Sequence, residues 1–455
     1  MNDNQRYFQW TEVHLEHFYA YFLVALVIAG YLVYKSTSKY KFELFFISFY
    51  LLTGNLNKLL TLKIPGFSLF EIQPVRFVFL LLLFFILRKT LFSREKFDLS
   101  INRNIPWFLA ALFAYVLLLI VSVLVNGPEI GIAEVLETIA DALAFLVLIF
   151  GLSLMADRPS YDLIGKAIII GAVASSLVSL VQLAIDPYFL RIGDNRIAFA
   201  GILRSNGIFD TEYFNSYYLI IAISWTLITL KNNLLKISLV GLFTLGVISS
   251  FQRMSWIILA LVLVIYLIYI KKVAFERLAM AGLSFLAILL TISIFYYQDI
   301  INSSLVNERL TDTVGGRKGY YAMVFNNIGK KPMFGYGDLK NEVYYVNLLR
   351  ITRNRDRATA TSGDLHSGYF SSLFLYGIPA FVCFTLFVLL SVIYYARWCK
   401  ENLYFVIPFL AGIIYMVGNL TNTFLFLKYI AVLYAIHIGI GMGIHKIREQ
   451  TASEN

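Results

Sequence analysis

The sequence predicts an all-helical integral membrane protein that crosses the bilayer many times. Hydrophobic residues make up 59% of the 455 residues and charged residues only 15%, which is more apolar surface than a soluble core can bury. Apolar stretches of about 20 residues, the length that crosses a hydrocarbon layer as a helix, recur along the whole chain with short polar breaks between them. These stretches are apolar on every side, whereas the strands of a membrane barrel alternate over about 10 residues.

A hydropathy window of about 19 residues predicts about 12–13 transmembrane helices. We expect thirteen spans near residues 17–34, 42–60, 75–89, 107–125, 133–155, 163–185, 213–230, 235–250, 255–270, 278–297, 368–395, 403–419 and 423–443. The second, the third and the last two are the least regular, because Lys58, Pro74 and the turn at 419–422 interrupt or shorten them. The first run lacks a preceding basic region and a following cleavage site, so it is expected to stay as an anchor.

The distribution of lysine and arginine predicts the orientation of the chain. Alternate loops are rich in these residues, for example 35–41, 88–103 and 271–277, and such loops normally stay in the cytoplasm. This places the amino terminus outside and the carboxyl terminus inside. It also places two long hydrophilic segments, 186–212 and 298–366, on the outer face.

The long outer segments set the expected organisation. Residues 1–185 are expected to hold the N-terminal transmembrane helices, and residues 186–455 to form a second membrane domain that includes the loop 298–366. Long loops of this kind are usually functional. After two glycines, the second loop contains a pattern typical of a short amphipathic helix at the membrane surface, with Tyr321, Val324, Phe325 and Ile328 on one face. Any chemistry must therefore be built from helix ends and these two loops.

Composition excludes several function classes. The net charge of +10 comes mostly from loops whose cations set orientation, so nucleic acid is not an expected partner. Two cysteines, Cys383 and Cys399, indicate neither a disulfide framework nor a metal site, and no cofactor is expected. The glycine-rich segments 315–318 and 335–337 lack the spacing and the ending of a P-loop.

Arginines gather on the predicted outer face, and they are the first candidates for a binding site. Guanidinium groups recognise phosphate in a bidentate way, and several of them suit a pyrophosphate. The five candidates are Arg191, Arg196, Arg204, Arg253 and Arg317. Arg253 stands in a tight turn between two spans, where an unpaired charge is costly. An arginine that reaches lipid headgroups is the alternative interpretation of this residue.

His366 is the candidate for proton transfer. It lies in the second outer loop just before a span, and an imidazole with a pKa near 6.5 suits a general base at neutral pH. A structural role is the alternative. His14 and His17 flank the first span, and His437 and His445 the last, where anchoring at the membrane ends is expected.

Three acids share one helical face at the start of the fifth span, namely Glu134, Glu137 and Asp141. Such a cluster can serve acid–base or metal chemistry. The stronger interpretation is structural, because acids in the first turns of a helix interact favourably with its dipole. A salt bridge to one of the arginines is the expected compromise.

Several of these residues, in this order, resemble the O-antigen polymerase and O-antigen ligase superfamily. Arg204-Ser205-Asn206-Gly207-Ile208-Phe209 with Asn215 is similar to that family's motif before a span, and Ser250-Phe251-Gln252-Arg253 to its Ser-x-x-Arg turn. The loop pattern follows in Arg317, Tyr321, Ile328, Pro332 and Gly335-Tyr336-Gly337, and the head of the next span in His366, Tyr369 and Gly377-Ile378. The resemblance covers about residues 200–395. Ser367 and Tyr321 depart from it, since many relatives have Asn and Trp there.

The resemblance implies an inverting, metal-independent glycosyltransferase with a membrane fold of the GT-C type. Its donor and acceptor would be oligosaccharides linked to undecaprenyl pyrophosphate, with membrane lipid around it and a chain-length regulator as a further partner. It would lie in the bacterial cytoplasmic (inner) membrane with its active site on the periplasmic face, and would make O-antigen or a similar surface polysaccharide.

The resemblance also gives roles to residues. His366 would accept the proton of the acceptor hydroxyl, while Arg253 and Arg317 would hold the pyrophosphate and stabilise its developing charge. Arg204, with Arg191, Arg196 and Tyr321, would seat the substrate.

Three other functions stay open at this point. An O-antigen ligase would transfer the glycan to lipid A core instead of extending it. A polysaccharide transporter or lipid-carrier flippase would show matched halves and ionisable residues at the membrane midplane, whereas the charges here crowd one face. A membrane scaffold would not explain the outer arginines.

Overall fold

The described part of the chain forms one bundle of helices. In the computed structural model, the described residues are 15–60, 62–63, 71–72, 74–92, 106–193, 197–199, 202–274, 276, 280, 321, 324–337, 367–426 and 428–454. The elements are α2 (Leu15–Lys35), α3 (Lys41–Thr53), η1 (Gly54–Leu60), β1 (Leu62–Lys63), β2 (Glu71–Ile72), α4 (Pro74–Phe92), α5 (Trp107–Val125), α6 (Gly127–Ile130), α7 (Ile132–Met155), α8 (Arg158–Ala184), β3 (Ile197–Phe199), β4 (Ile202–Leu203), α9 (Glu212–Thr229), α10 (Asn233–Ser249), α11 (Arg253–Tyr269), α17 (Gly368–Trp398), η2 (Leu403–Phe405), α18 (Val406–Gly418) and α19 (Tyr429–Glu454).

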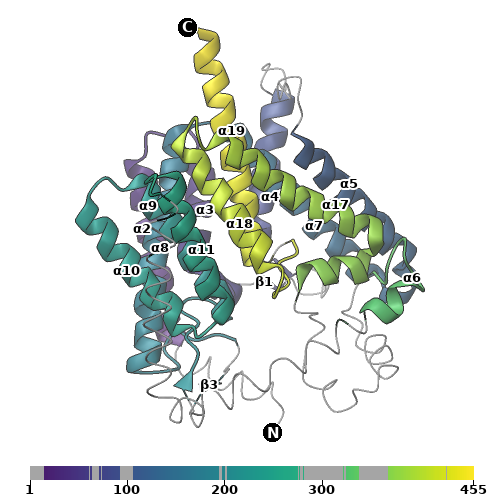
Figure 1. Ribbon diagram of the computed structural model, residues 1–455, viewed down its shortest axis with the longest axis horizontal. Helices are drawn as coiled ribbons and strands as arrows, with labels where there is room; N and C mark the ends of the chain where they lie inside the picture. Colours follow the sequence, from purple (N-terminus) through teal and green to yellow (C-terminus); the bar gives the residue numbers. More distant parts are fainter. Residues whose placement is uncertain are drawn as a thin grey trace.

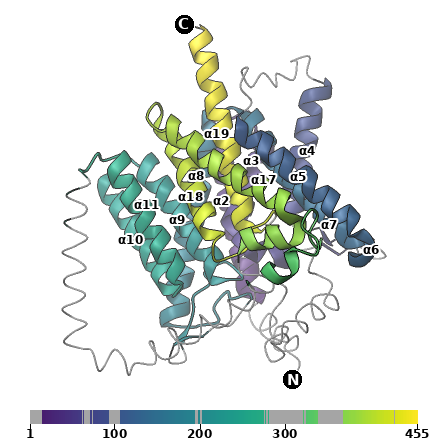
Figure 2. The same ribbon diagram turned by 45° about the vertical axis from the view of Figure 1, so that its right-hand side comes forward.

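The helices form two groups joined by a central pair. In Figures 1 and 2, α9, α10 and α11 lie on one side and α5, α7 and α17 on the other, with α18 and α19 between them. In the span of α19, 83% of the residues are buried, against 28% in the span of α2. This difference identifies α19 as the central helix of the bundle.

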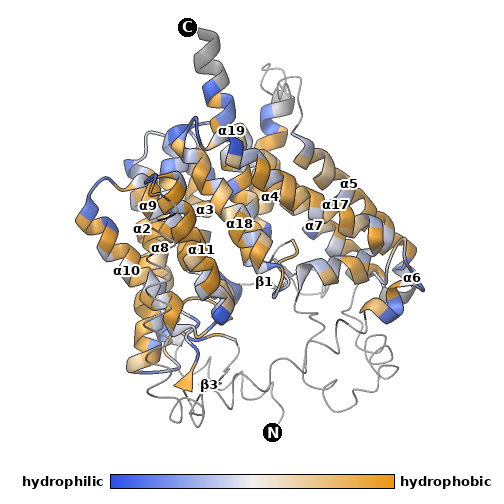
Figure 3. Cartoon of the chain, in the orientation of Figure 1, coloured by the Kyte–Doolittle hydropathy of each residue, from blue (hydrophilic) through white to orange (hydrophobic). Residues whose placement is uncertain are grey.

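The predicted class is confirmed: the protein is a multi-pass membrane protein built from helices. Among the described residues, six helices are long and apolar enough to cross a bilayer, namely α2, α5, α7, α8, α17 and α19. Three shorter apolar helices accompany them, at Asn233–Ser249, Arg253–Tyr269 and Leu403–Gly418. Figure 3 shows hydrophobic residues along the helices and hydrophilic residues towards both ends of the bundle, as lipid around the middle requires. Two short antiparallel pairs, β1–β2 and β3–β4, were not predicted.

The helices agree with the predicted spans except at three places: the second span, the last span and a break within α17. The second predicted span continues to residue 60, but α3 ends at Thr53 and the chain turns into the 3-10 helix η1 at Gly54. The last predicted span starts six residues too early, because residues 423–426 form a turn and α19 begins at Tyr429. The tenth predicted span, 278–297, lies outside the described residues apart from residue 280.

The third difference is a break in α17. The sequence predicts one straight span over 368–395, but Gly377 has φ 87° and ψ 177°, which are not helical values. Pro379 follows the break and lacks an amide hydrogen, so it cannot continue the helical hydrogen bonding. The segment 368–376 therefore lies across the end of the bundle, while the rest of α17 rises through it (Figures 1 and 2).

One end of the bundle carries the candidate residues, and we call it the site face. α8 ends there, α9, α11 and α17 begin there, and the β3–β4 pair lies beside them, at the bottom of Figure 1. The carboxyl terminus lies at the opposite face. That the site face is the outer face of the membrane stays a prediction.

Candidate active site

The segment after β4 is held against the end of α8 by one buried glutamine. The Gln182 side chain is 1% exposed. Its Oε1 accepts from the amides of Asn206 and Gly207, both at 2.9 Å, and its Nε2 donates to the carbonyl of Gly207 at 3.1 Å. This fixes the backbone of the Arg204–Phe209 motif at the site face.

Asn215 completes the same scaffold from α9. Its Nδ2 donates to Ser179 Oγ at 2.9 Å, and its Oδ1 accepts from Ser175 Oγ at 2.7 Å. The Ile208 amide donates to the same Ser175 hydroxyl at 3.2 Å. The asparagine of the motif is thus buried between α8 and α9, where it holds the loop and does not face a substrate.

A buried ion pair lies in this scaffold. Arg204 Nη1 donates to Glu212 Oε1 at 2.5 Å, and Glu212 is only 1% exposed. Arg191 supports the same segment, since its Nη2 donates to the Arg204 carbonyl at 2.7 Å and its Nε to the Pro187 carbonyl at 2.6 Å. Two of the predicted arginines therefore lie together.

The charges around this pair favour an anion. Burial lowers the pKa of Arg191 to about 10, although the nearby carboxylates of Glu212 and Asp186 act in the opposite direction and raise it. The guanidinium therefore stays charged at neutral pH. Arg191, Arg204 and Arg253 therefore bring three guanidinium groups to the site face, where Glu212 pairs with Arg204.

Arg253 lies on a turn that is bonded to the Arg204 segment. The Ser205 amide donates to the Ser249 carbonyl at 3.1 Å, and Ser216 Oγ donates to Ser250 Oγ at 2.7 Å. Arg253 itself is the first residue of α11 and is exposed. The two sequence motifs, which are more than 40 residues apart in the chain, are therefore neighbours in space.

The head of α17 is attached to the same face. The Gly368 amide donates to the carbonyls of Asn419 at 2.9 Å and Asn422 at 3.0 Å, and Ser367 Oγ donates to the Asn419 carbonyl at 3.1 Å. Asn422 Nδ2 donates to the Tyr217 hydroxyl of α9 at 3.0 Å. The turn after α18 thus links the head of α17 to the helix that carries Glu212.

Tyr321 lies on the first segment of α17. Its ring centroid is 4.5 Å from that of Phe370, and the ring of Phe325 lies 5.6 Å from the same residue. Residues 324–328 are helical, as predicted. Val324 is buried, but Phe325 is 62% exposed, so the predicted apolar face is not uniformly covered by protein.

Three predicted site residues, Arg196, Arg317 and His366, lie outside the described residues. The same holds for His14 and for the side chain of Glu134. His366 directly precedes Ser367, the N-cap residue of α17.

The carboxylates of α7 pair with an arginine that the sequence did not single out. Arg76 Nη2 lies 2.7 Å from Glu137 Oε1 and 3.5 Å from Asp141 Oδ1. Among the described residues, the expected salt bridge is therefore present between α7 and α4.

His437 corrects one expectation. It was predicted to anchor a membrane end, yet it is 0% exposed. Its Nε2 accepts from Trp225 Nε1 at 2.8 Å, and its Nδ1 lies 2.6 Å from the Leu433 carbonyl. Both ring nitrogens are used inside the bundle, because α19 is its central helix.

Some residues of the site could not be found by sequence reasoning. Gln182 lies in an apolar helix without a motif around it, and Glu212 lies between Phe209 and Asn215 but is not one of the residues that carry the motif. The signal for Glu212 was its place in the first turn of α9, eight residues after Arg204.

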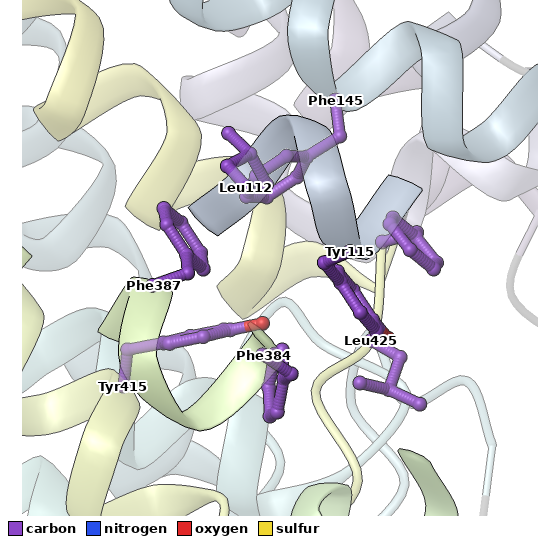
Figure 4. A pocket seen from close by; sticks show the side chains of 8 residues that line it. Leu112, Tyr115, Phe145, Phe384, Phe387, Tyr415 and Leu425 are labelled. Carbon is purple, nitrogen blue, oxygen red and sulfur yellow. The ribbon is translucent and has the colours of Figure 1, made fainter. Parts of the chain in front are cut away.

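An apolar pocket lies among α5, α7, α17 and α18 (Figure 4). It is lined by Leu112, Tyr115, Phe145, Phe384, Phe387, Tyr415, Leu425 and Phe426. All eight lining residues are apolar or aromatic, and none of them carries a charge.

One segment of the chain matches a known protein family. Residues 237–385, about a third of the chain, match the family model described as O-antigen ligase. This match confirms the resemblance to the O-antigen polymerase and ligase superfamily. It covers Arg253, Arg317, Tyr321 and His366, but not Arg204. No curated protein matches the chain.

The family match sets the general function. It indicates a membrane enzyme of the glycosyltransferase kind, with an O-antigen ligase or polymerase type of function and lipid-linked glycans as substrates. The hydrogen bond between Ser205 and Ser249 joins the matched segment to the Arg204 motif outside it.

Proposed function

We propose that this protein transfers a glycan from an undecaprenyl pyrophosphate-linked oligosaccharide to another lipid-linked glycan, and so polymerises O-antigen or a similar polysaccharide. The observation that carries the proposal is the joining of two arginine motifs at one face of the bundle. Arg204 is held by the buried Glu212, and its segment is bonded to the turn that begins α11 at Arg253. Guanidinium groups at fixed positions suit a pyrophosphate leaving group.

The proposed reaction is a single inverting displacement. The acceptor hydroxyl oxygen forms a bond to the anomeric carbon as the bond from that carbon to the pyrophosphate oxygen breaks. His366 takes the hydroxyl proton, and the undecaprenyl pyrophosphate leaves with the bonding electrons. Arg253 and Arg317 stabilise the charge on the leaving group, while Arg204, Arg191, Arg196 and Tyr321 seat the substrate. No metal takes part.

The surroundings of the described arginines support this division of roles. Arg204 and Arg191 bond to a buried carboxylate and to backbone carbonyls, so they are fixed before a substrate arrives. Arg253 is exposed at the first turn of its helix. A fixed pair beside an accessible guanidinium fits an anion that enters from the site face.

The test uses purified protein in lipid nanodiscs with the lipid-linked oligosaccharide and no added metal or nucleotide. Chain growth is scored by gel. We expect His366→Ala and Arg317→Ala to abolish growth while the protein stays inserted and abundant. Arg253→Lys should also fail, because lysine keeps the charge but loses the planar fork. Wild-type product from both alanine variants contradicts the proposal.

The pH dependence gives a second readout. A general base must be unprotonated, so the rate should rise with pH as the base loses its proton. A rate that rises in the same way in His366→Ala removes this residue from the role.

A ligase is the second candidate, because the matching family model is described as O-antigen ligase. The two functions differ only in the acceptor. Incubation with a second lipid-linked repeat unit or with lipid A core separates them, since a polymerase extends the first and a ligase modifies the second.

A further inference from the structure

The break in α17 leaves two carbonyl groups without their helical donors. In a regular helix the Leu375 carbonyl would accept from residue 379, but Pro379 has no amide hydrogen. The Phe374 carbonyl would accept from Ile378, whose amide instead donates to the Pro332 carbonyl at 2.8 Å. Buried carbonyls of this kind need other donors.

Two residues within the second long loop supply those donors. The Tyr336 amide donates to the Phe374 carbonyl at 3.0 Å, and the Gly337 amide to the Leu375 carbonyl at 2.7 Å. The Tyr336 ring stacks on Phe374 with centroids 4.6 Å apart. The backbones approach so closely that a Cβ on Gly335, which has φ +56°, would lie 2.5 Å from the Leu375 carbonyl.

Two side chains at the end of α5 complete this joint, Ser122 in its last turn and Asn126 as its C-cap residue. Ser122 Oγ donates to the Phe334 carbonyl and lies 3.1 Å from the Leu375 carbonyl. Asn126 Nδ2 donates to the Gly335 carbonyl at 3.2 Å, and Asn126 Oδ1 accepts from Lys331 Nζ at 3.0 Å. We call the joint between residues 331–337, residues 374–378 and these two side chains the clasp.

The polar side chains of the clasp are deeply buried. Ser122 is 0% exposed and Asn126 is 3% exposed. A hydrogen bond made at such a site is costly to remove, because water cannot easily replace the lost donor to a buried carbonyl. Both residues lie in the N-terminal half of the chain, outside the segment that matches the family model.

The clasp decides where the head of α17 lies. The nine residues of the segment 368–376 would extend a straight helix by about 13 Å along its axis. The bend instead turns the segment across the site face, where the Gly368 amide reaches the carbonyls of Asn419 and Asn422. His366 is the residue that precedes this head in the chain.

We infer that Ser122 and Asn126 are positioning residues, which hold the bend of α17 and thereby set the head of this helix at the site face. The inference rests on the proposed function for its kinetic consequence but not for its structural one. Neither residue is given a part in the proposed transfer itself. Their effect is on the placement of Ser367, and through it on the catalytic geometry.

A disulfide reports the placement directly. Ser371 Oγ and Thr423 Oγ1 lie 3.2 Å apart, between the first segment of α17 and the turn after α18. Cysteines at these two positions are therefore close enough to be oxidised to a disulfide. The background is S371C/T423C with Cys383 and Cys399 replaced by alanine, in full-length protein in nanodiscs.

The variants are Ser122→Ala, Asn126→Ala and Asn126→Asp, each compared with Ser153→Ala. Asp keeps the acceptor for Lys331 but loses the donor to Gly335, so it tests the clasp without a change of volume. Ser153 is a matched control, since it is 1% exposed and, within the described part of the chain, its hydroxyl bonds to the Phe150 carbonyl of its own helix at 3.0 Å.

We expect slower and less complete cross-linking in Ser122→Ala and Asn126→Asp, and unchanged cross-linking in Ser153→Ala. Unchanged cross-linking in all clasp variants overturns the inference, whatever the activity. If the parent protein has no transferase activity, the proposed function fails, and the cross-linking result still decides the role of the clasp.

Enzyme kinetics provide a second test of the inference. A displaced head should lower kcat by about tenfold to a hundredfold, the size expected for a misplacement of about 1 Å, with the KM for the lipid-linked donor within about twofold. Oxidation of the cysteine pair should restore kcat in the clasp variants, and a reductant should remove the gain. A disulfide that forms without restoring kcat shows that the clasp does not act through the position of the helix head.

Discussion

The pairing of Arg204 with Glu212 predicts that a double variant is more stable than one of its two single variants. The perturbations are Arg204→Met, Glu212→Gln and the double variant. Arg204→Met leaves the Glu212 carboxylate, whose side chain is 2% exposed, without its closest cation. Glu212→Gln leaves the Arg204 guanidinium, whose side chain is 20% exposed and can still reach solvent. The first single variant should therefore be the less stable of the two.

The magnitudes follow from burial. Removing one partner of a buried ion pair costs about 3–5 kcal/mol, and Arg191 near Glu212 reduces this to about 2–4 kcal/mol for Arg204→Met. Glu212→Gln keeps a neutral acceptor for Arg204, so the hydrogen bond to Arg204 loses its charge-assisted part, about 1–2 kcal/mol. In the double variant the uncompensated carboxylate is gone, so it should be more stable than Arg204→Met alone by about 1 kcal/mol or more.

The assay is a double-mutant cycle on the free energy of unfolding, measured by denaturant titration of the purified protein in mixed micelles with tryptophan fluorescence as the signal. Coupling between the two positions should be clear, because the atoms lie 2.5 Å apart. Additive single effects, or a double variant that is less stable than both singles, would refute the idea that Glu212 exists as the counter-charge of Arg204.

Three further predictions concern the bundle around the site. Gly377→Ala should lower the thermal midpoint strongly, because φ is +87° and the new Cβ would lie 2.4 Å from the Met333 carbonyl. The control Gly241→Ala, whose new Cβ would have nothing within 4 Å, should leave the midpoint unchanged or raise it. Equal midpoints of the two variants would contradict the strained bend. His437→Phe leaves the Trp225 indole N–H without its acceptor and should lower the free energy of unfolding by about 1–3 kcal/mol. The pH profile of glycan transfer should stay that of the wild type. A shifted profile would show that this histidine takes part in the transfer. Arg76→Met should cost about 1–2 kcal/mol, since the carboxylates on α7 that it neutralises are partly exposed; an unchanged free energy of unfolding would contradict a stabilising role for this contact.

The sequence could predict the parts of the fold that depend on local composition. Span positions follow from the length of apolar runs, because each run must shield its own backbone from lipid. The predictions over 107–125 and 213–230 accordingly agree with α5 and α9 within a residue or so. Predictions were wrong where a polar contact from elsewhere in the chain stops a helix, as at Gly54, where the amides of Asn55 and Leu56 donate to the Ile208 carbonyl.

For the site, the sequence alone determined which residue types were candidates and that Arg191 and Arg204 would share one segment. Only the tertiary structure decided that Glu212 pairs with Arg204 and that Asn215 holds the loop against α8. It also decided that Arg76 forms the salt bridge with the carboxylates of α7. It also decided the bend of α17, whose Gly377 and Pro379 are visible in the sequence but whose freed carbonyls need donors from residues 331–337. The physical reason is that apolar length and charge can be read residue by residue, whereas the partner of a buried polar group depends on which helices pack together.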